Sequence, residues 1–144
     1  MRNQLASQMK NLYDKFMSNQ KRIHADFVAE HSQFTTPSGD TYEFKESSGP
    51  YEYLLGALSG CLFITFRGIA TKMKVNWTHI SLDIEGVKRE EVPTWLKECT
   101  VAATVTGSDD NEKFTKCFEK ATRYCSVYQT LSQVAQMHWK VQFN

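Results

Sequence analysis

Four cysteines are the side chains in this sequence best suited to nucleophilic, redox or metal chemistry. No two of them form a C-x-x-C pair, and the four histidines are scattered along the chain. The cysteines are Cys61, Cys99, Cys117 and Cys125. The histidines are His24, His31, His79 and His138. Because the short Cys and His spacings of zinc sites are missing, the sequence predicts no metal site, and the cysteines are structural or catalytic.

Cys61 falls within a long predicted helix. Pro50 follows Gly49 and suits the first position of a helix, and the next segment, 51–73, contains no further proline. The segment is apolar on nearly every side, which is typical of a central, buried helix. Cys61 is therefore expected in or beside the core of the domain.

Cys125 falls near the end of a second predicted helix, 109–125. Asp109 and Glu112 form a capping box at its start, and its apolar residues keep helical spacing. Two central helices in so small a domain should touch, so Cys61 and Cys125 could approach within disulfide reach. A redox pair is thus geometrically plausible, while composition alone favours buried packing residues for both thiols.

The other segments predict an α+β domain with helices packed against antiparallel sheet. Alternation of apolar and polar residues indicates strands. These are expected at 23–29, around Phe34, at 41–44, 80–85, 99–106 and 137–143. A short helical turn is expected after residue 125. Apolar residues at three- and four-residue steps predict an extra amphipathic helix over residues 1–20.

Length and charge narrow the classes of function. The chain has 144 residues, with 17 basic and 16 acidic side chains, which favours a single domain over 1–144 and no nucleic-acid partner. Residues 53–70 form the longest apolar stretch, which polar residues interrupt, so a buried helix is expected there and not a membrane span. No signal peptide is evident. We therefore expect a cytoplasmic protein without a disulfide framework.

Two segments together resemble a known family. "GPYEYLLGALSGC" and, much later, "ATRYCSVYQTLSQ" resemble the two signatures of the OsmC/Ohr family, named after osmotically inducible protein C and organic hydroperoxide resistance protein. The similarity runs in order from about residue 23 to residue 143. It implies an α+β fold of antiparallel sheets packed around two central helices. It also implies an intertwined homodimer.

The resemblance implies a thiol-dependent peroxidase. In the family the first cysteine, here Cys61, attacks an organic hydroperoxide and becomes a sulfenic acid. The second, here Cys125, condenses with it to a disulfide, which an external dithiol or lipoyl-type reductant reduces without a bound cofactor. The apolar residues around Cys61 favour a small apolar hydroperoxide as substrate. Cys99 and Cys117 have no counterpart in the family and are interpreted as packing residues.

Four further residues are candidates for supporting roles by this resemblance. Glu52 lies nine positions before Cys61 and could organise hydrogen bonds beside the thiol. Tyr51 stands where the best-known peroxidases of the family carry the acidic residue. Arg22 could substitute for the family's arginine, and Tyr128 would make the substrate pocket more aromatic.

Ser126 departs from the family pattern, because a proline commonly follows the second cysteine.

Two other classes of function stay open. One is a redox-sensing or non-catalytic protein of the same fold that binds an apolar small molecule. The other is a structural dimer with inert cysteines.

Overall fold

The computed structural model describes residues 19–28 and 30–144. The chain divides into two compact units, one up to Gly49 and the other from Pro50 to Asn144. The extra amphipathic helix expected over residues 1–20 lies almost entirely outside the described residues. The prediction of a single domain over 1–144 stays a prediction.

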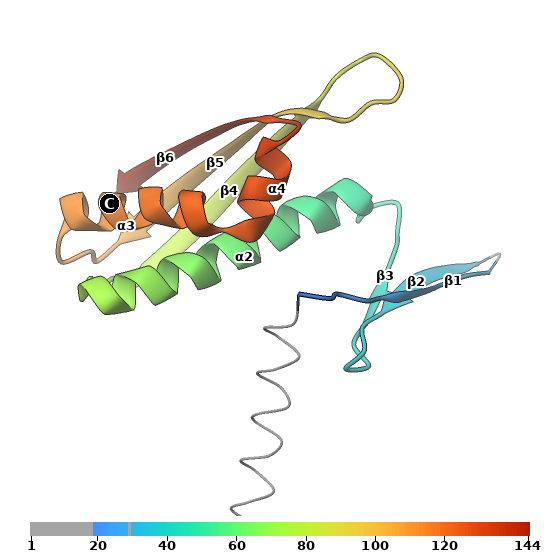
Figure 1. The fold of residues 1–144 in the computed structure, drawn as a ribbon, viewed down its shortest axis with the longest axis horizontal. Coiled ribbons are helices and arrows are strands. Elements are labelled where there is room, and N and C mark those ends of the chain that lie inside the picture. The colour runs from blue at the N-terminus through green and yellow to red at the C-terminus, as the bar shows by residue number, and fades with distance from the viewer. Residues whose placement is uncertain (1–18, 29) are drawn as a thin grey trace, which may run out of the picture. The chain divides into compact units, whose positions relative to one another are not determined.

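The described part of the first unit is a small antiparallel meander. Its strands pair in the order β1-β2-β3 (Figure 1). They are β1 (His24–Val28), β2 (His31–Thr35) and β3 (Thr41–Glu43). The turn between β2 and β3 contains Gly39 at φ +95°, a conformation that favours glycine. The three strands expected in this part of the chain are therefore confirmed.

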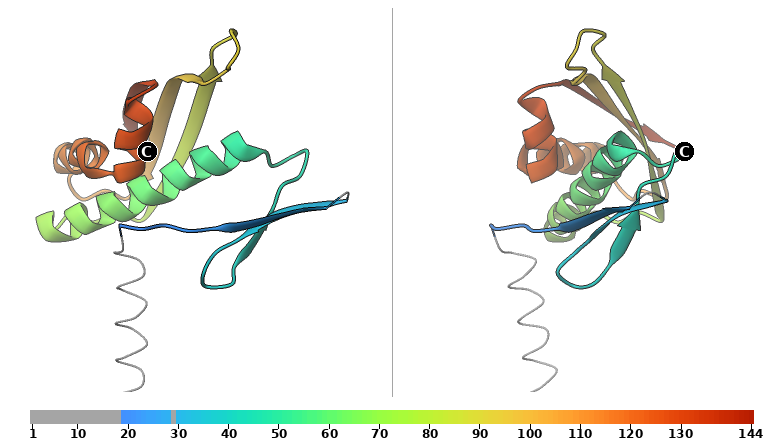
Figure 2. Two further views of the ribbon diagram at one scale, coloured as in Figure 1. Left: turned by 45° about the vertical axis from the view of Figure 1, so that its right-hand side comes forward. Right: turned by 90° about the vertical axis from the view of Figure 1, so that its right-hand side faces the viewer.

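The second unit is one sheet with helices on one face (Figures 1 and 2). The sheet order is β4-β5-β6. Its strands are β4 (His79–Lys88), β5 (Leu96–Thr106) and β6 (Gln136–Phe143). The helices are α2 (Pro50–Met73), α3 (Asn111–Tyr124) and α4 (Ser126–Ser132). The predicted α+β class is confirmed.

The direction of β6 corrects the expectation of antiparallel pairing throughout. β4 and β5 are antiparallel, but β6 runs parallel to β5. A parallel neighbour requires a long crossover connection, and α3 and α4 together provide it. The sequence predicted that β4 ends at Gly86, but the strand continues for two more residues, to Lys88.

Helix α2 begins and ends with identifiable local signals. Pro50 is its first residue, as expected. At its end Lys74 has φ +55°, and its N–H donates to the Thr71 carbonyl at 3.2 Å. The Val75 N–H donates to the Ala70 carbonyl at 3.0 Å, which completes a Schellman motif. α2 therefore turns back toward β4 at a defined position.

Only one stripe of α2 is fully buried within the chain. The buried residues recur every four positions and are Leu58, Leu62, Phe66 and Ala70. Phe66 packs against Phe114 of α3, with ring centroids 4.6 Å apart. Ile64 on another side of the helix is 44% exposed. The helix is therefore central as predicted, but its apolar surface is only partly covered.

The start of α3 differs from the predicted capping box by one residue. Asp110, and not Asp109, is the N-cap, and its carboxylate accepts from the Lys113 N–H at 2.9 Å. Asp109 instead accepts from the backbone N–H and side-chain amide of Asn76, at 3.1 and 2.7 Å. Asp110 therefore caps α3, and Asp109 binds Asn76. The sequence spacing alone does not show which aspartate is the cap.

Candidate functional site

Cys61 and Cys125 meet where α2 packs against the start of α4. Cys61 Sγ lies 3.6 Å from Ser126 Oγ, and the Cys61 and Cys125 thiols lie close enough for each to shift the pKa of the other. Cys61 is partly exposed, whereas Cys125 is fully buried. Both are free thiols in this structure. The expected approach of the two cysteines is thus present, with one thiol accessible from solvent and the other behind it.

The backbone between α3 and α4 explains how Cys125 reaches this position. Cys125 ends α3 and caps α4 with an extended conformation, φ −70° and ψ 115°. Its sulfur accepts from the Tyr128 N–H at 3.5 Å, as a side chain at an N-cap does. Cys125 therefore lies at the junction of two helices and not within one, and the first N–H groups of α4 have no partner inside that helix.

The surroundings of Cys61 favour its thiolate. Burial raises its pKa, but four hydrogen bonds together outweigh burial, so that the pKa lies below its ordinary value. In order of effect these donors are the Val127 N–H, the Cys125 thiol, the Ser126 hydroxyl and the Ser126 N–H. A thiol with a lowered pKa and partial exposure has the two properties that a reactive cysteine needs.

Cys125 has the opposite character. Burial raises its pKa, and the hydrogen bond and the charge of Cys61 add to this effect, giving a pKa of about 11. The Tyr128 and Val127 N–H groups lower it only in part. Cys61 is therefore the first of the two thiols to ionise, and Cys125 keeps its proton at neutral pH. This asymmetry matches a nucleophilic thiol beside a second thiol that reacts later.

The structure does not bring Glu52 to the thiol within one chain. Glu52 is exposed and lies in the first turn of α2. Nine residues of a regular helix place two side chains on nearly opposite faces and about 13 Å apart along the axis. Among the residues that the structure describes, Glu52 has no hydrogen bond or ion pair. Its predicted role stays a prediction.

Tyr51 anchors the start of α2 to the β4–β5 hairpin. Its hydroxyl donates to the Thr94 carbonyl at 3.4 Å, and the Lys88 ammonium lies 4.6 Å from its ring centroid. These contacts give Tyr51 a structural task at this end of the helix. Arg22 belongs to the first unit, where it is exposed just before β1. Its supporting role stays a prediction.

Tyr128 packs in the core of the second unit. Its side chain is only 6% exposed, and burial raises its pKa, with the charges of Cys99 and Cys125 adding to the effect. Its backbone, however, contributes directly to the site through the bond to Cys125 Sγ. Tyr128 therefore supports the buried thiol more than it shapes an open pocket.

Cys99 and Cys117 have the surroundings of packing residues. Both are fully buried, and burial raises the pKa of each thiol. Cys117 Sγ lies 3.4 Å from Met73 Sδ, between α3 and the end of α2. Neither thiol shares the exposure or the donors of Cys61.

Ser126 and Val127 are the site residues that sequence reasoning did not assign. The backbone N–H of each lowers the pKa of Cys61, and the Ser126 hydroxyl oxygen lies 3.6 Å from Cys61 Sγ. A backbone N–H is present in every residue except proline, so the residue type does not show which N–H donates to the thiol. The available signal was the serine itself, because a proline in its place would have neither an N–H nor a hydroxyl.

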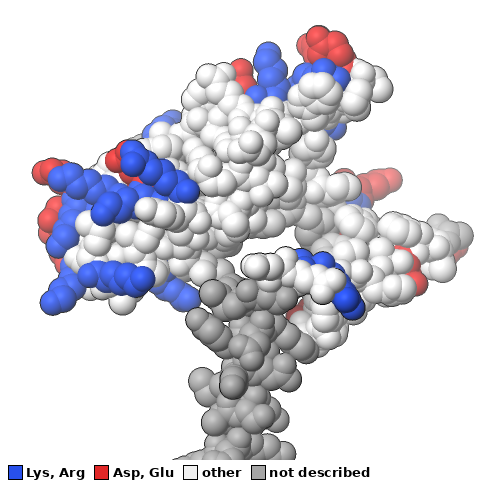
Figure 3. Space-filling view, viewed as in Figure 1, with Lys and Arg blue, Asp and Glu red and all other residues white. Residues whose placement is uncertain are grey.

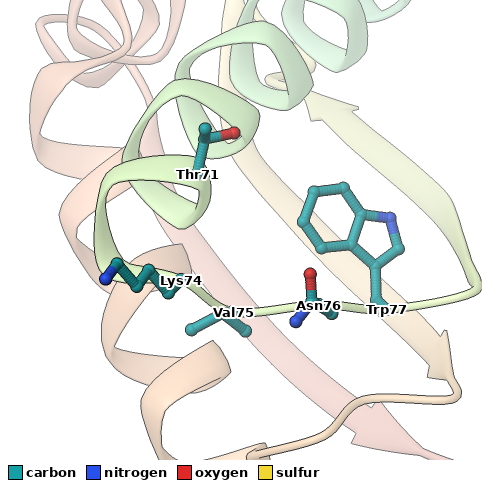
Figure 4. A pocket seen from close by; sticks show the side chains of 5 residues that line it. All are labelled: Thr71, Lys74, Val75, Asn76 and Trp77. Carbon is teal, nitrogen blue, oxygen red and sulfur yellow. The ribbon is translucent and has the colours of Figure 1, made fainter.

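A pocket lies away from the thiols, around the C-terminal end of α2 (Figure 4). It is lined by Thr71, Lys74, Val75, Asn76 and Trp77. Thr71 follows Cys61 by ten residues, which is about 15 Å along the helix axis. No cysteine lines this pocket, and no cluster of three metal-ligating side chains occurs among residues 19–28 and 30–144.

By length and composition α2 is also the one described helix that could cross a membrane. Its buried stripe packs against α3 and the sheet, as expected of the core helix of a folded domain. Arg67 lies on the same helix, with its guanidinium 5.9 Å from the ring centroid of Phe63. The interpretation as a core helix is therefore preferred.

Comparison with known proteins places this site in a family. The family model for OsmC-like proteins matches residues 44–140, a range that contains both Cys61 and Cys125. The chain belongs to the OsmC-like protein family. No curated protein matches the chain. The resemblance found in the two sequence segments is thereby confirmed.

Solved structures of OsmC-like proteins share the fold. An OsmC-like protein from Mycoplasma pneumoniae is 16% identical, with a TM-score of 0.77 over 88% of this chain and 99% of that one. A hypothetical protein from Aquifex aeolicus is 20% identical, with a TM-score of 0.73 over 88% and 99%. An organic hydroperoxide resistance protein from Bacillus subtilis is 13% identical, with a TM-score of 0.63 over 85% and 98%.

Proposed function

We propose that this OsmC-like protein is a thiol-dependent peroxidase that reduces organic hydroperoxides through Cys61 and Cys125. The observation that carries the proposal is the unequal thiol pair. Cys61 is partly exposed with a lowered pKa, and Cys125 is buried beside it with a pKa raised to about 11. Solved structures similar to this chain include organic hydroperoxide resistance proteins, which supports the same reaction class.

The first step would oxidise Cys61. Its thiolate attacks the terminal oxygen of the hydroperoxide, the O–O bond breaks, and the alkoxide takes a proton from solvent to leave as an alcohol. Cys61 is then a sulfenic acid. Its negative charge is lost, so one of the causes that raise the pKa of Cys125 disappears.

The second step would join the two cysteines. The Cys125 thiol loses its proton, its sulfur attacks the Cys61 sulfur, and water leaves as the disulfide forms. The proximity of the two thiols, each of which shifts the pKa of the other, supports this step. An external dithiol or lipoyl-type reductant then supplies two electrons and two protons and restores both thiols. No bound cofactor or metal takes part in this proposal.

Disulfide mapping tests this proposal. Reduced protein is treated with one equivalent of cumene hydroperoxide and analysed by non-reducing peptide mass spectrometry. We expect rapid loss of the peroxide and a link between Cys61 and Cys125. A Cys117→Ala variant is the matched control and should form the same link, because Cys117 lies outside the thiol pair. Unspent peroxide with both thiols still free would contradict the proposed activity.

A redox-sensing or ligand-binding protein is the second candidate function. One observation favours it: in the part of the chain that the structure describes, no Lys or Arg side chain hydrogen-bonds to Cys61. A thiolate held by neutral donors alone would react more slowly with peroxide than one beside a fixed positive charge. In that case the mapping experiment would give the disulfide without repeated turnover in the presence of a dithiol.

We also propose that the protein forms a homodimer. The apolar surface of α2 is only partly covered, with Ile64 44% exposed. On the face seen in Figure 3, charged residues of both signs lie at α3 and at the loop after β4, while α4 has no charged residue. An uncovered apolar surface is a common feature of subunit interfaces. Light scattering should give twice the monomer mass of 16.6 kDa, and a monomer would contradict the proposal.

A further inference from the structure

Ser126 presents two hydrogen-bond donors to the sulfur of Cys61. Its hydroxyl oxygen lies 3.6 Å from Sγ, within hydrogen-bonding distance for sulfur. Its backbone N–H also lowers the pKa of Cys61. Ser126 is the first residue of α4, so its N–H has no partner inside the helix. The residue type and its position at the helix start therefore both contribute to this contact.

The direction of the hydroxyl contact depends on the state of Cys61. While Cys61 is a thiol, either group can donate to the other. A thiolate has no proton and can only accept, so Ser126 must then donate. Hydrogen bonds to a charged acceptor are stronger than bonds between neutral groups. The contact is therefore worth more to the ionised cysteine than to the neutral one.

The Ser126 hydroxyl neither caps α4 nor forms another hydrogen bond within that helix. Cys125, and not Ser126, provides the side-chain cap of α4. The Thr130 hydroxyl bonds to the backbone carbonyl of Ser126 and not to its side chain. Among the described residues, Cys61 is the only hydrogen-bond partner of Ser126 Oγ.

We propose that Ser126 is a further catalytic residue, which holds Cys61 as a thiolate through its hydroxyl and its backbone N–H. In this way the chain supplies at the start of α4 a neutral stabilisation of the negative charge. The inference rests on the proposed function in one respect, since the thiolate that Ser126 stabilises is the proposed nucleophile. The ionisation of Cys61 can nevertheless be measured without any peroxide.

Three variants separate the two donors. Ser126→Ala removes the hydroxyl and keeps the N–H, Ser126→Pro removes both, and Ser126→Thr keeps both. Proline should be tolerated, because it suits the first position of a helix and Cys125 before it already has the extended backbone that precedes proline. Ser132→Ala is the matched control. It removes a hydroxyl from the same helix that bonds to the Gln129 carbonyl.

The readout is the rate of Cys61 alkylation by iodoacetamide as a function of pH, followed by peptide mass spectrometry. Below the inflection of this profile we expect the rate to fall about threefold in Ser126→Ala and about tenfold in Ser126→Pro, because fewer donors stabilise the thiolate. The inflection should move to higher pH in the same order. Ser126→Thr and Ser132→Ala should follow the wild-type profile.

Two results would overturn the inference. One is an unchanged pH profile in both Ser126→Ala and Ser126→Pro. The other is an equal shift in Ser132→Ala, which would trace the effect to the helix in general. Peroxide turnover is measured separately. A shifted alkylation profile in a protein that does not consume peroxide would support the role of Ser126 and count against the proposed function alone.

Discussion

Cys125→Ser is expected to convert a reversible oxidation of Cys61 into an irreversible one. With cumene hydroperoxide in excess, the variant should accumulate Cys61 sulfinic acid, whereas the wild-type protein should stop at the disulfide. The serine hydroxyl can still donate to Cys61, so the first oxidation should proceed. It cannot attack the sulfenic acid as a thiolate does, and a second hydroperoxide then reacts instead.

Peptide mass spectrometry of Cys61 measures this effect as the addition of two oxygen atoms. We expect the sulfinic form to be the main product in Cys125→Ser and a minor one in the wild-type protein. Cys117→Ala, treated in the same way, controls for the loss of one thiol and should resemble the wild type. Equal amounts of sulfinic acid in wild type and Cys125→Ser would contradict a resolving role for Cys125.

Much of the fold could be predicted because its signals are local. Pro50 after Gly49 sets the start of α2, and the alternation after residue 98 identifies β5, whose residues Cys99 and Val101 are buried as expected. Each of these signals involves only neighbouring residues. The approach of Cys61 and Cys125 was also expected, because two apolar helices in a small domain have to pack together.

The direction of β6 could not be predicted in this way. Its alternating residues bury one face, and this pattern is the same whether the strand runs parallel or antiparallel to β5. The direction depends on the path of the chain through α3 and α4. That path turns on the extended conformation of Cys125 between the two helices, which a helical sequence pattern does not reveal.

The environment of Cys61 was predictable only in part. The sequence identified the cysteine and its partner, but it directed attention to Glu52, which the geometry of α2 keeps away from the thiol. The donors that lower the pKa of Cys61 come from the Cys125 thiol, the start of α4 and Ser126. Backbone N–H groups belong to almost every residue, so only the folded structure shows which of them meet a thiolate.

Cys61→Ser is expected to abolish peroxide consumption. The serine hydroxyl is nearly isosteric with the thiol, so α2 and its contact with Ser126 should be retained. Its proton is not lost near neutral pH, and the neutral hydroxyl is a weak nucleophile toward an O–O bond. We therefore expect the rate of cumene hydroperoxide loss, with a dithiol present, to fall to that of buffer alone.

The comparison with Cys125→Ser makes this result specific. Cys125→Ser should still consume about one or two equivalents of peroxide before it stops, as Cys61 passes through sulfenic to sulfinic acid. Cys61→Ser should consume none, although Cys125 is still present, because Cys125 stays buried, and burial is the largest cause that raises the pKa of that thiol and keeps it protonated. Peroxide consumption by Cys61→Ser equal to that of the wild type would show that another thiol is the nucleophile. The unequal surroundings of the two cysteines would then have no catalytic meaning.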